Sequence, residues 1–318
     1  MTDDLASHVW IEVAFRCKAW DPSVMAALVM KYPALTEADL SCSPVTDLGP
    51  LAALAGTLRS LRLSAAPQVS DFRPVSSLTN LEELCCEGER VHELSWIVPL
   101  TRLRRLDLVS TLVVELDHLS GLRDLTELRL NGSGRVRDLS PLSTLTNLQS
   151  LDLSETRAWN LEQITALTGL RSIGLKETRV RSLAPLSQLT DLESIDCSMT
   201  AVSDLTPLGA LSRLRRLNCF ETDVRDIAAV AALGNLEWLN VSQTSVGTLT
   251  PLMACTRLRQ LEVRHTNVAD FSPLMALLAS LEHLECDNDV VQRLPAPLQA
   301  MTKTRRRHVN WDDEDAAV

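Results

Sequence analysis

The side chains that could do chemistry do not fall into a catalytic arrangement. The sequence contains no glycine-rich phosphate loop, no H-E-x-x-H zinc motif and no G-x-S-x-G nucleophile motif. His265 and His283 are a possible metal-ligand pair, but the strand positions assigned below separate them by about 16 Å, too far to share one ion. We therefore predict a chain that is not an enzyme, with no catalytic residue, no metal site and no cofactor.

The acidic and amide residues instead recur at a fixed interval. One set has members spaced by 22 residues: Asp196, Asn218, Asn240 and Glu262. Asp152 lies two such intervals before Asp196. Such spacing puts polar side chains at one place in successive copies of a repeated unit, where they form a ladder across neighbouring strands. A ladder of this kind either binds a partner or keeps an open face soluble.

The repeated unit behind this interval is defined by leucines. Its apolar residues lie at the first, fourth, sixth, fourteenth, seventeenth and twentieth places, usually with Thr at the ninth and Val at the eleventh. Successive first places are 22 or 23 residues apart: Leu35, Leu58, Leu81, Leu103, Leu125, Leu148, Leu170, Leu192, Leu214, Leu236, Leu258 and Leu281. A period of this size predicts a solenoid, in which each unit buries its apolar face against the next.

Within one unit the pattern indicates a strand followed by a short helical return. Alternation puts the fourth and sixth side chains inside and the fifth and seventh on the open face. We expect the ninth-place Thr to satisfy backbone groups where the chain leaves the strand. Four returns begin with Ser-Pro or Thr-Pro, which predicts an N-cap followed by the first helical residue: Ser140, Thr206, Thr250 and Ser272.

The L-x-x-L-x-L unit with its S-x-T-x-V-x-D-L-x-P-L continuation resembles the leucine-rich repeat superfamily, most nearly its 22-residue internalin-like and phosphatase-regulator-like class. The resemblance covers roughly residues 35–294. It implies an α/β solenoid, curved, with parallel strands on the concave face and short helices or turns on the convex face. Thr stands at the ninth place where this family usually has Asn. In relatives that regulate a phosphatase, the concave face offers acidic and aromatic side chains at fixed places, and four residues here stand in comparable columns: Asp196, Phe220, Trp238 and Glu262.

Three regions are predicted along the chain. Residues 1–34 form an N-terminal helical cap, with helical apolar spacing over 4–20 and a second helix over 24–29. Residues 35–294 form an array of about twelve repeats, and residues 295–318 form a C-terminal cap with a charged tail.

Two aromatic residues interrupt the polar concave face. Phe220 is seventh in its repeat and Trp238 is third in the next, so both are expected to point to solvent from adjacent strands. An exposed aromatic pair ringed by polar groups is typical of a protein interface. The predicted partner-binding residues are therefore Asp152, Asp196, Arg216, Asn218, Phe220, Glu221, Trp238, Asn240, Glu262 and His265.

Composition restricts the class of partner and the cellular location that we expect. A net charge of −10 and a pI of about 5.2 argue against a nucleic-acid partner. No stretch reaches membrane-spanning length, and residues 1–20 lack the layout of a signal peptide. Four of the eight cysteines occupy the apolar sixth place, as small core residues rather than a disulfide framework: Cys86, Cys197, Cys219 and Cys286. We predict a cytoplasmic, reducing location and no membrane partner.

Three hypotheses for function remain open. The first is a non-catalytic scaffold that binds a protein in its concave face and works within a larger complex. The second, by resemblance alone, is a regulatory subunit of an enzyme such as a protein phosphatase. The third is a secreted or host-directed recognition protein of the internalin kind. Reactive thiols favour the first two, and glycans at the sequons of Asn131 or Asn240 favour the third.

Overall fold

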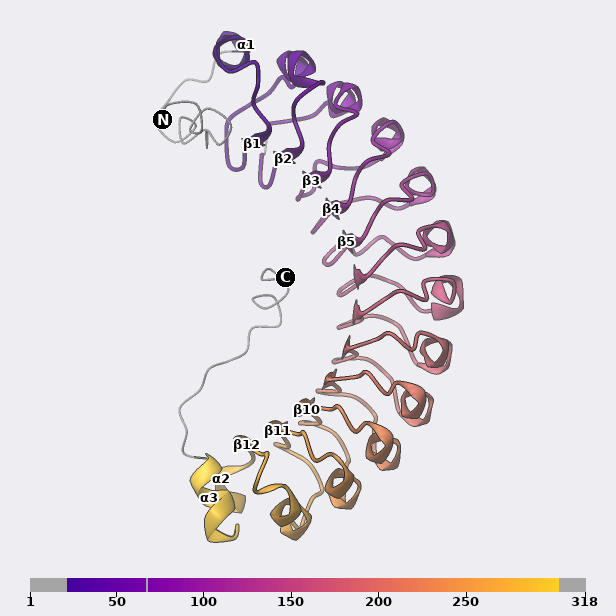
Figure 1. The fold of residues 1–318 in the computed structure, drawn as a ribbon, viewed down its shortest axis with the longest axis vertical. Coiled ribbons are helices and arrows are strands. Elements are labelled where there is room, and N and C mark those ends of the chain that lie inside the picture. The colour runs from indigo at the N-terminus through magenta and orange to yellow at the C-terminus, as the bar shows by residue number, and fades with distance from the viewer. Residues whose placement is uncertain (1–21, 67, 303–318) are drawn as a thin grey trace.

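The leucine repeat folds into a curved parallel sheet. The computed structural model describes residues 22–66 and 68–302, and within them twelve strands pair in chain order from β1 to β12. Figure 1 shows the strands along the inside of an arc and short helices along the outside. The predicted α/β leucine-rich repeat solenoid is therefore confirmed.

Each strand covers the third to fifth places of its repeat. The strands are β1 (Glu37–Asp39), β2 (Ser60–Arg62), β3 (Glu83–Cys85), β4 (Arg105–Asp107), β5 (Glu127–Arg129), β6 (Ser150–Asp152), β7 (Ser172–Gly174), β8 (Ser194–Asp196), β9 (Arg216–Asn218), β10 (Trp238–Asn240), β11 (Gln260–Glu262) and β12 (His283–Glu285). Equivalent residues of neighbouring repeats face one another in register.

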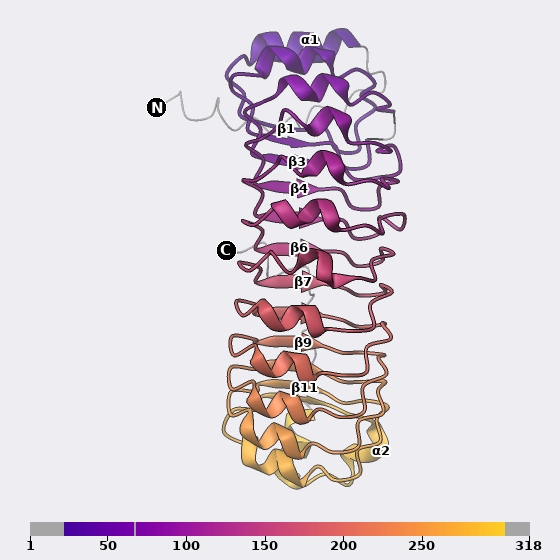
Figure 2. The same cartoon turned by 90° about the vertical axis from the view of Figure 1, so that its right-hand side faces the viewer.

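The returns are 3-10 helices, stacked along the convex side in Figure 2. A 3-10 helix rises about 2.0 Å per residue, against about 1.5 Å in an α-helix, so it spans a short repeat with fewer residues. They are η2 (Gly49–Leu54), η3 (Arg73–Ser77), η4 (Ser95–Ile97), η5 (Asp117–Leu119), η6 (Ser140–Thr144), η7 (Leu161–Ile164), η8 (Ala184–Gln188), η9 (Thr206–Ala210), η10 (Ala228–Ala232), η11 (Thr250–Ala254) and η12 (Ser272–Leu277).

The core is a continuous column of aliphatic side chains. In β8, Ile195 is paired with Ile173 of β7 on one side and Leu217 of β9 on the other, and all three are fully buried. Because each buried side chain is covered by the repeats on both sides, the stability of one repeat depends on its neighbours.

The chain leaves each strand through a left-handed residue at the eighth place, which the sequence analysis did not anticipate. Nine non-glycine residues there have φ between 48° and 60°: Cys42, Ala65, Ser110, Glu155, Glu177, Met199, Glu221, Gln243 and His265. Gly88 and Gly132 occupy the same place, and glycine there is the sequence feature that could have indicated a left-handed residue. Inter-repeat hydrogen bonds hold the turn, such as the one from the Glu177 amide to the Ser198 carbonyl at 3.0 Å.

The expected role of the ninth-place Thr is confirmed. The buried Thr200 hydroxyl donates to the Cys197 carbonyl at 2.6 Å, closing the turn out of the strand. The same bond recurs at Thr156, Thr178, Thr222, Thr244 and Thr266. Thr therefore satisfies a backbone group at the strand exit, the role that the resemblance assigns to Asn, through a shorter side chain.

Replacing Thr200 with valine should lower the free energy of unfolding by about 1–2 kcal/mol, because a buried carbonyl loses its donor while side-chain volume is kept. The matched control is Thr266→Val. Thr266 is only half-buried and its bond to Val263 is 3.3 Å, so the loss should be smaller. Urea unfolding followed by circular dichroism measures both variants, and equal losses would contradict the assigned role.

The predicted N-caps of the returns are wrong in detail. Ser140 and Thr206 are the first residues of their helices, and the preceding leucines make no side-chain cap. The cap comes from an aspartate two residues before the helix: Asp138 accepts from the Ser140 amide at 3.0 Å, and Asp204 from the Thr206 amide at 2.8 Å. Hydrogen bonds lower the pKa of both carboxyl groups, chiefly from the Ser140 amide for Asp138 and from the Thr206 side chain and then its amide for Asp204.

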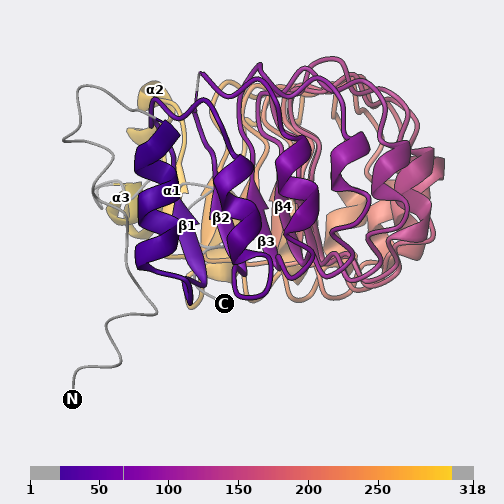
Figure 3. The ribbon, with the colours of Figure 1, turned by 90° about the horizontal axis from the view of Figure 1, so that it is seen from above.

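Short α-helices lie at both ends of the described chain. Helix α1 (Pro22–Lys31), which confirms the helix expected over 24–29, packs on the first repeat through Met25 and Val29 (Figure 3). Helices α2 (Asn288–Val291) and α3 (Ala296–Thr302) follow β12, and Leu298 of α3 is buried. The division at residues 34 and 295 stays a prediction. The expected helix over 4–20 and the charged tail lie outside the described residues.

Candidate binding surface on the concave face

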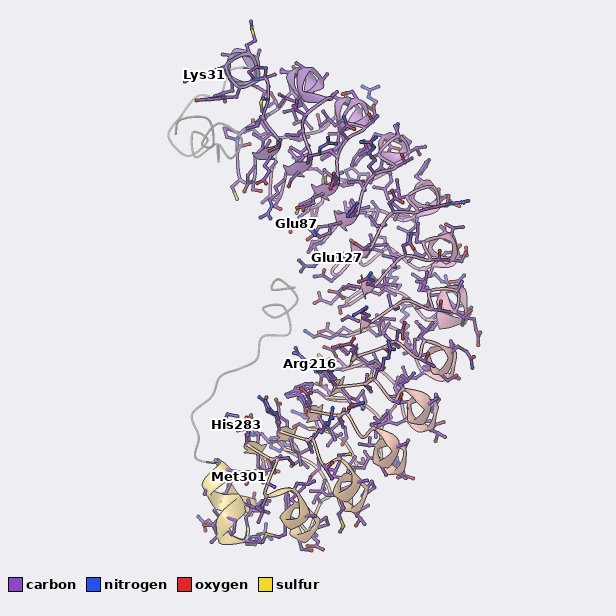
Figure 4. All side chains as sticks on the ribbon, viewed as in Figure 1. Lys31, Glu87, Glu127, Arg216, His283 and Met301 are labelled. Carbon is purple, nitrogen blue, oxygen red and sulfur yellow. The ribbon has the colours of Figure 1, made fainter. Side chains whose placement is uncertain are left out.

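A groove runs along the concave face from β1 to β7. Its volume is about 570 Å³, and its lining combines both signs of charge from the third, fifth and seventh places. The charged lining residues are Asp39, Arg62, Glu83, Glu87, Arg105, Asp107, Glu127, Arg129 and Asp152. In Figure 4 the side chains of Glu87 and Glu127 lie on the inner side of the arc, as do Arg216 and His283 further along the chain. We call this surface the concave groove.

The concave groove is richer in arginine than the sequence analysis anticipated. Two of its arginines, Arg62 and Arg129, stand at the fifth place, and the third place adds Arg105 together with Glu83 and Glu127. Arg105 pairs with Glu83 in the preceding strand, and Arg129 lies 3.3 Å from Asp107. Tabulating the third place alongside the fifth would have revealed these alternating charges.

The fifth-place carboxylates and amides also have a structural role in the turn that follows each strand. Their oxygens accept the backbone N–H two residues later, at 2.9 Å for Asp152 and Ser154 and at 2.8 Å for Asp196 and Ser198. Gly174, between these two in the column, leaves the room that the Asp152 carboxylate needs.

Two members of the fifth-place column are buried and form side-chain hydrogen bonds to the neighbouring strand. Asp196 is 5% exposed and accepts from the Asn218 amide at 3.2 Å. Asn240 is 7% exposed and donates to Glu262 at 2.9 Å. These four predicted residues therefore form two cross-strand pairs, in which Asn218 and Glu262 keep more surface than their partners.

Burial raises the pKa of two carboxyl groups in this column. Desolvation dominates for Asp196, against hydrogen bonds from Ser198 and Asn218. Desolvation also raises the pKa of Asp107 to about 6, although Arg129 opposes the shift. The carboxylate of Asp107 is 16% exposed, so water offsets little of this penalty.

Asp107 should make stability fall as pH rises from about 4 to about 6. Its folded pKa of about 6 lies above the ordinary aspartate value of 3.8, so the folded state binds the proton more tightly in that window. Asp107→Asn should remove this fall and raise the free energy of unfolding at pH 7 by about 1 kcal/mol, once the lost Arg129 pair is counted.

Urea unfolding from pH 4 to pH 8 measures this effect in the Asp107→Asn variant. Asn218 shows that an amide at the fifth place still accepts the backbone N–H. Asp39→Asn, which makes the same change at the same place in β1, is the control for losing a fifth-place carboxylate that accepts a backbone N–H. A wild-type slope that persists in Asp107→Asn would refute the assignment.

The aromatic pair lies on the concave face but is half-buried, not fully exposed as expected. Trp238 is paired in register with Arg216 and Gln260, whose side chains flank its indole. The Phe220 amide donates to Asn218 at 3.1 Å, which fixes the backbone beneath the ring. A flanked, half-buried aromatic is well positioned for a partner contact, because little conformational freedom is left to lose.

The remaining predicted residues lie at the strand exits. Glu221 and His265 are exposed in left-handed turns, and His265 lies 3.4 Å from Asp287. Nine of the ten predicted residues thus belong to repeats that contain β8 to β11, whereas Asp152 alone lines the concave groove.

One cluster in the concave groove brings together possible metal ligands from two repeats. The ligand atoms of Cys85, Glu87 and Asp107 lie within 4.8 Å of one another. Desolvation raises the pKa of the Cys85 thiol to about 12, and Ser64 lies 2.9 Å from its sulfur. Arg129 already supplies positive charge beside Asp107.

No helix of the described chain combines the length and the apolar character that crossing a bilayer requires. The sequence matches no protein-family model and no curated protein.

Solved structures do match. An internalin (InlF) from Listeria monocytogenes is similar with a TM-score of 0.75 and 24% sequence identity, covering 83% of this chain and 80% of the internalin. A plant peptide hormone receptor, RGFR1, in complex with RGF2 has a TM-score of 0.62 and 16% identity, over 80% of this chain and 48% of the receptor. TLR13 in a complex with ssRNA13 has a TM-score of 0.63 and 19% identity, over 81% and 44%.

These matches have sequence identities below 25%, so they establish the architecture alone. Together with the twelve-strand sheet, they show that the chain is a leucine-rich repeat protein in fold, with an internalin among its structural neighbours.

Proposed function

We propose that this chain is a non-catalytic scaffold that binds a protein partner along its concave face. The observation that carries the proposal is the continuous, charged concave groove, lined from seven successive strands. Twelve strands at about 4.8 Å spacing give a face about 50 Å long, which is enough for a standard protein interface.

The charge pattern of the concave groove favours a protein over a nucleic acid. Arg62, Arg105 and Arg129 alternate with acidic neighbours, so the lining offers donors and acceptors to a polypeptide of mixed charge. A nucleic acid would need a basic stripe, and the chain carries a net charge of −10. The structure of RGFR1 with RGF2 is consistent with peptide binding on this fold.

Phe220 and Trp238 lie on the same concave face beyond the end of the concave groove, at β9 and β10, and supply the apolar part of the proposed interface. Aromatic side chains in well-packed positions dominate binding energies, while surrounding polar contacts set orientation. Arg216, Asn218 and Glu262 provide such contacts around the pair.

Affinity capture from the source cell tests the proposal with two matched double variants. Phe220→Ala/Trp238→Ala alters the concave face, and Met253→Ala/Met275→Ala alters two exposed apolar residues of η11 and η12 on the convex face. We expect the concave variant to lose the partner that the wild type and the convex variant retain. Equal recovery by both variants would contradict binding at this surface.

The proposal includes a reducing, intracellular setting and membership of a larger complex. The described cysteines are free thiols, and Cys197 and Cys219 lie with their sulfurs 3.6 Å apart without a bond between them. If the captured partner is an enzyme whose activity the chain changes, the scaffold acts as a regulatory subunit.

A second candidate is a surface or host-directed recognition protein, and the likeness to InlF supports it. Protease treatment of intact cells distinguishes the two, because a surface protein is cleaved and an internal one is protected.

A further inference from the structure

Five exposed arginines surround an exposed tryptophan on one edge of the solenoid, away from the concave face. They lie on the loops that lead from β5, β6 and β7 to η6, η7 and η8. The residues are Arg135, Arg137, Arg157, Arg179 and Arg181, with Trp159 between them, and we call this surface the arginine patch. Trp159 is 55% exposed, whereas Trp96 in η4 is buried.

The backbone presents these side chains on one side of a fixed scaffold. The residues between them, Val136, Ala158 and Val180, are fully buried. The Arg157 amide donates to the Val136 carbonyl, and the Arg179 amide to the Ala158 carbonyl, both at 2.9 Å. The residues on either side of these buried positions in three adjacent repeats therefore face outward together, so a ligand would meet a preorganised surface.

The charges of the arginine patch are uncompensated within the part of the chain that the structure describes. None of the five guanidinium groups makes an ion pair or a side-chain hydrogen bond there. Several exposed arginines elsewhere are paired, such as Arg213 with Asp191 at 2.6 Å and Arg171 with Glu193 at 3.6 Å. The next repeat has Ala201 and Ser203 at the equivalent places, so the concentration of positive charge is local.

Local positive charge on an acidic protein indicates a particular kind of ligand. Guanidinium groups bind carboxylates in a bidentate way, and a half-exposed indole offers apolar area that a simple anion leaves unused. A long nucleic acid would extend beyond three repeats onto a chain with a net charge of −10, which repels it.

We propose that the arginine patch is a second interaction surface, which binds a short acidic peptide segment bearing an apolar residue that packs on Trp159. This surface is distinct from the concave face, so the chain can hold two protein segments at once.

A fluorescein-labelled peptide of about twelve residues, glutamates around a central Leu-Phe pair, is the probe. Fluorescence anisotropy at low salt measures its binding to the full chain, because exposed charges are screened at higher ionic strength. Arg157→Glu/Arg179→Glu should weaken binding by about tenfold or more, and Trp159→Ala by about fivefold or more.

The matched control is Arg90→Glu/Arg225→Glu, which changes net charge equally at the tenth and twelfth places of other repeats. It should weaken binding much less than Arg157→Glu/Arg179→Glu, because neither residue contacts the peptide and only the long-range part of the attraction changes. Thermal unfolding by circular dichroism checks that each variant folds.

Three outcomes would overturn the proposal. They are no peptide binding at low salt, an equal loss in the control variant, and tighter binding of a single-stranded oligonucleotide of equal length through the same arginines. Since Phe220 and Trp238 are intact in these variants, the concave-face proposal stands or falls separately.

Discussion

Replacing Ile195 with alanine should lower the free energy of unfolding by about 2–5 kcal/mol. Ile195 is fully buried at the centre of β8, between Ile173 and Leu217. The loss combines the transfer energy of the deleted methyl and methylene groups with the cavity that rigid neighbours on both sides cannot close. Urea unfolding followed by circular dichroism measures the change in midpoint and slope.

Leu284→Ala, at the fourth place of the last repeat and in strand β12, is the matched control. Leu284 is also buried, but β12 pairs with β11 alone in the described sheet, so its repeat has one strand neighbour. The loss should be smaller, because the end of a solenoid can fray while the centre holds the array together. At the other end of the sheet, the fourth place of the first repeat is already an alanine, Ala38. A larger loss at Leu284 than at Ile195 would contradict this description of the core.

Trp238→Ala should weaken partner binding by about 2 kcal/mol or more, roughly thirtyfold, while the fold stays intact. The indole is half-buried on the concave face between Arg216 and Gln260, so truncation removes contact area from the proposed interface without opening the core. Isothermal titration with the captured partner measures the change, and circular dichroism confirms the fold.

Met253→Ala is the control for that measurement. Met253 is half-exposed on η11, on the convex side, and its truncation should leave affinity unchanged. Full affinity in Trp238→Ala would remove the aromatic pair from the interface, and a loss in Met253→Ala would move the interface to the convex side.

The fold could be predicted from the sequence because buried residues recur at a regular interval in a repeat protein. Leu192, Ile195 and Cys197 recur at fixed places, and a 22-residue period leaves few ways to bury them. The ninth-place Thr was also interpretable, because a small hydroxyl at a strand exit has one plausible task. The helix caps were misassigned, because Asp138 and Ser140 are both good capping residues and the choice depends on where the helix begins.

The candidate surface was less predictable because it depends on contacts between repeats. Alternation placed Asp196 and Asn240 on the open face but could not show that cross-strand pairs bury them. The same limit applies to Phe220 and Trp238, whose exposure is set by side chains of adjacent strands. The arginine patch was missed because the repeats were compared at their strand residues and not at the loop residues that follow the strands.

Hydroxyl-radical footprinting of the complex tests the central claim, that the concave face holds the partner. Trp, Phe and Met are oxidised according to their exposure, and this chain carries reporters on both sides. We expect the partner to protect Phe220 and Trp238 while Met253 and Met275 react as in the free chain. Protection of the two methionines, with the aromatic pair as reactive as before, would contradict it.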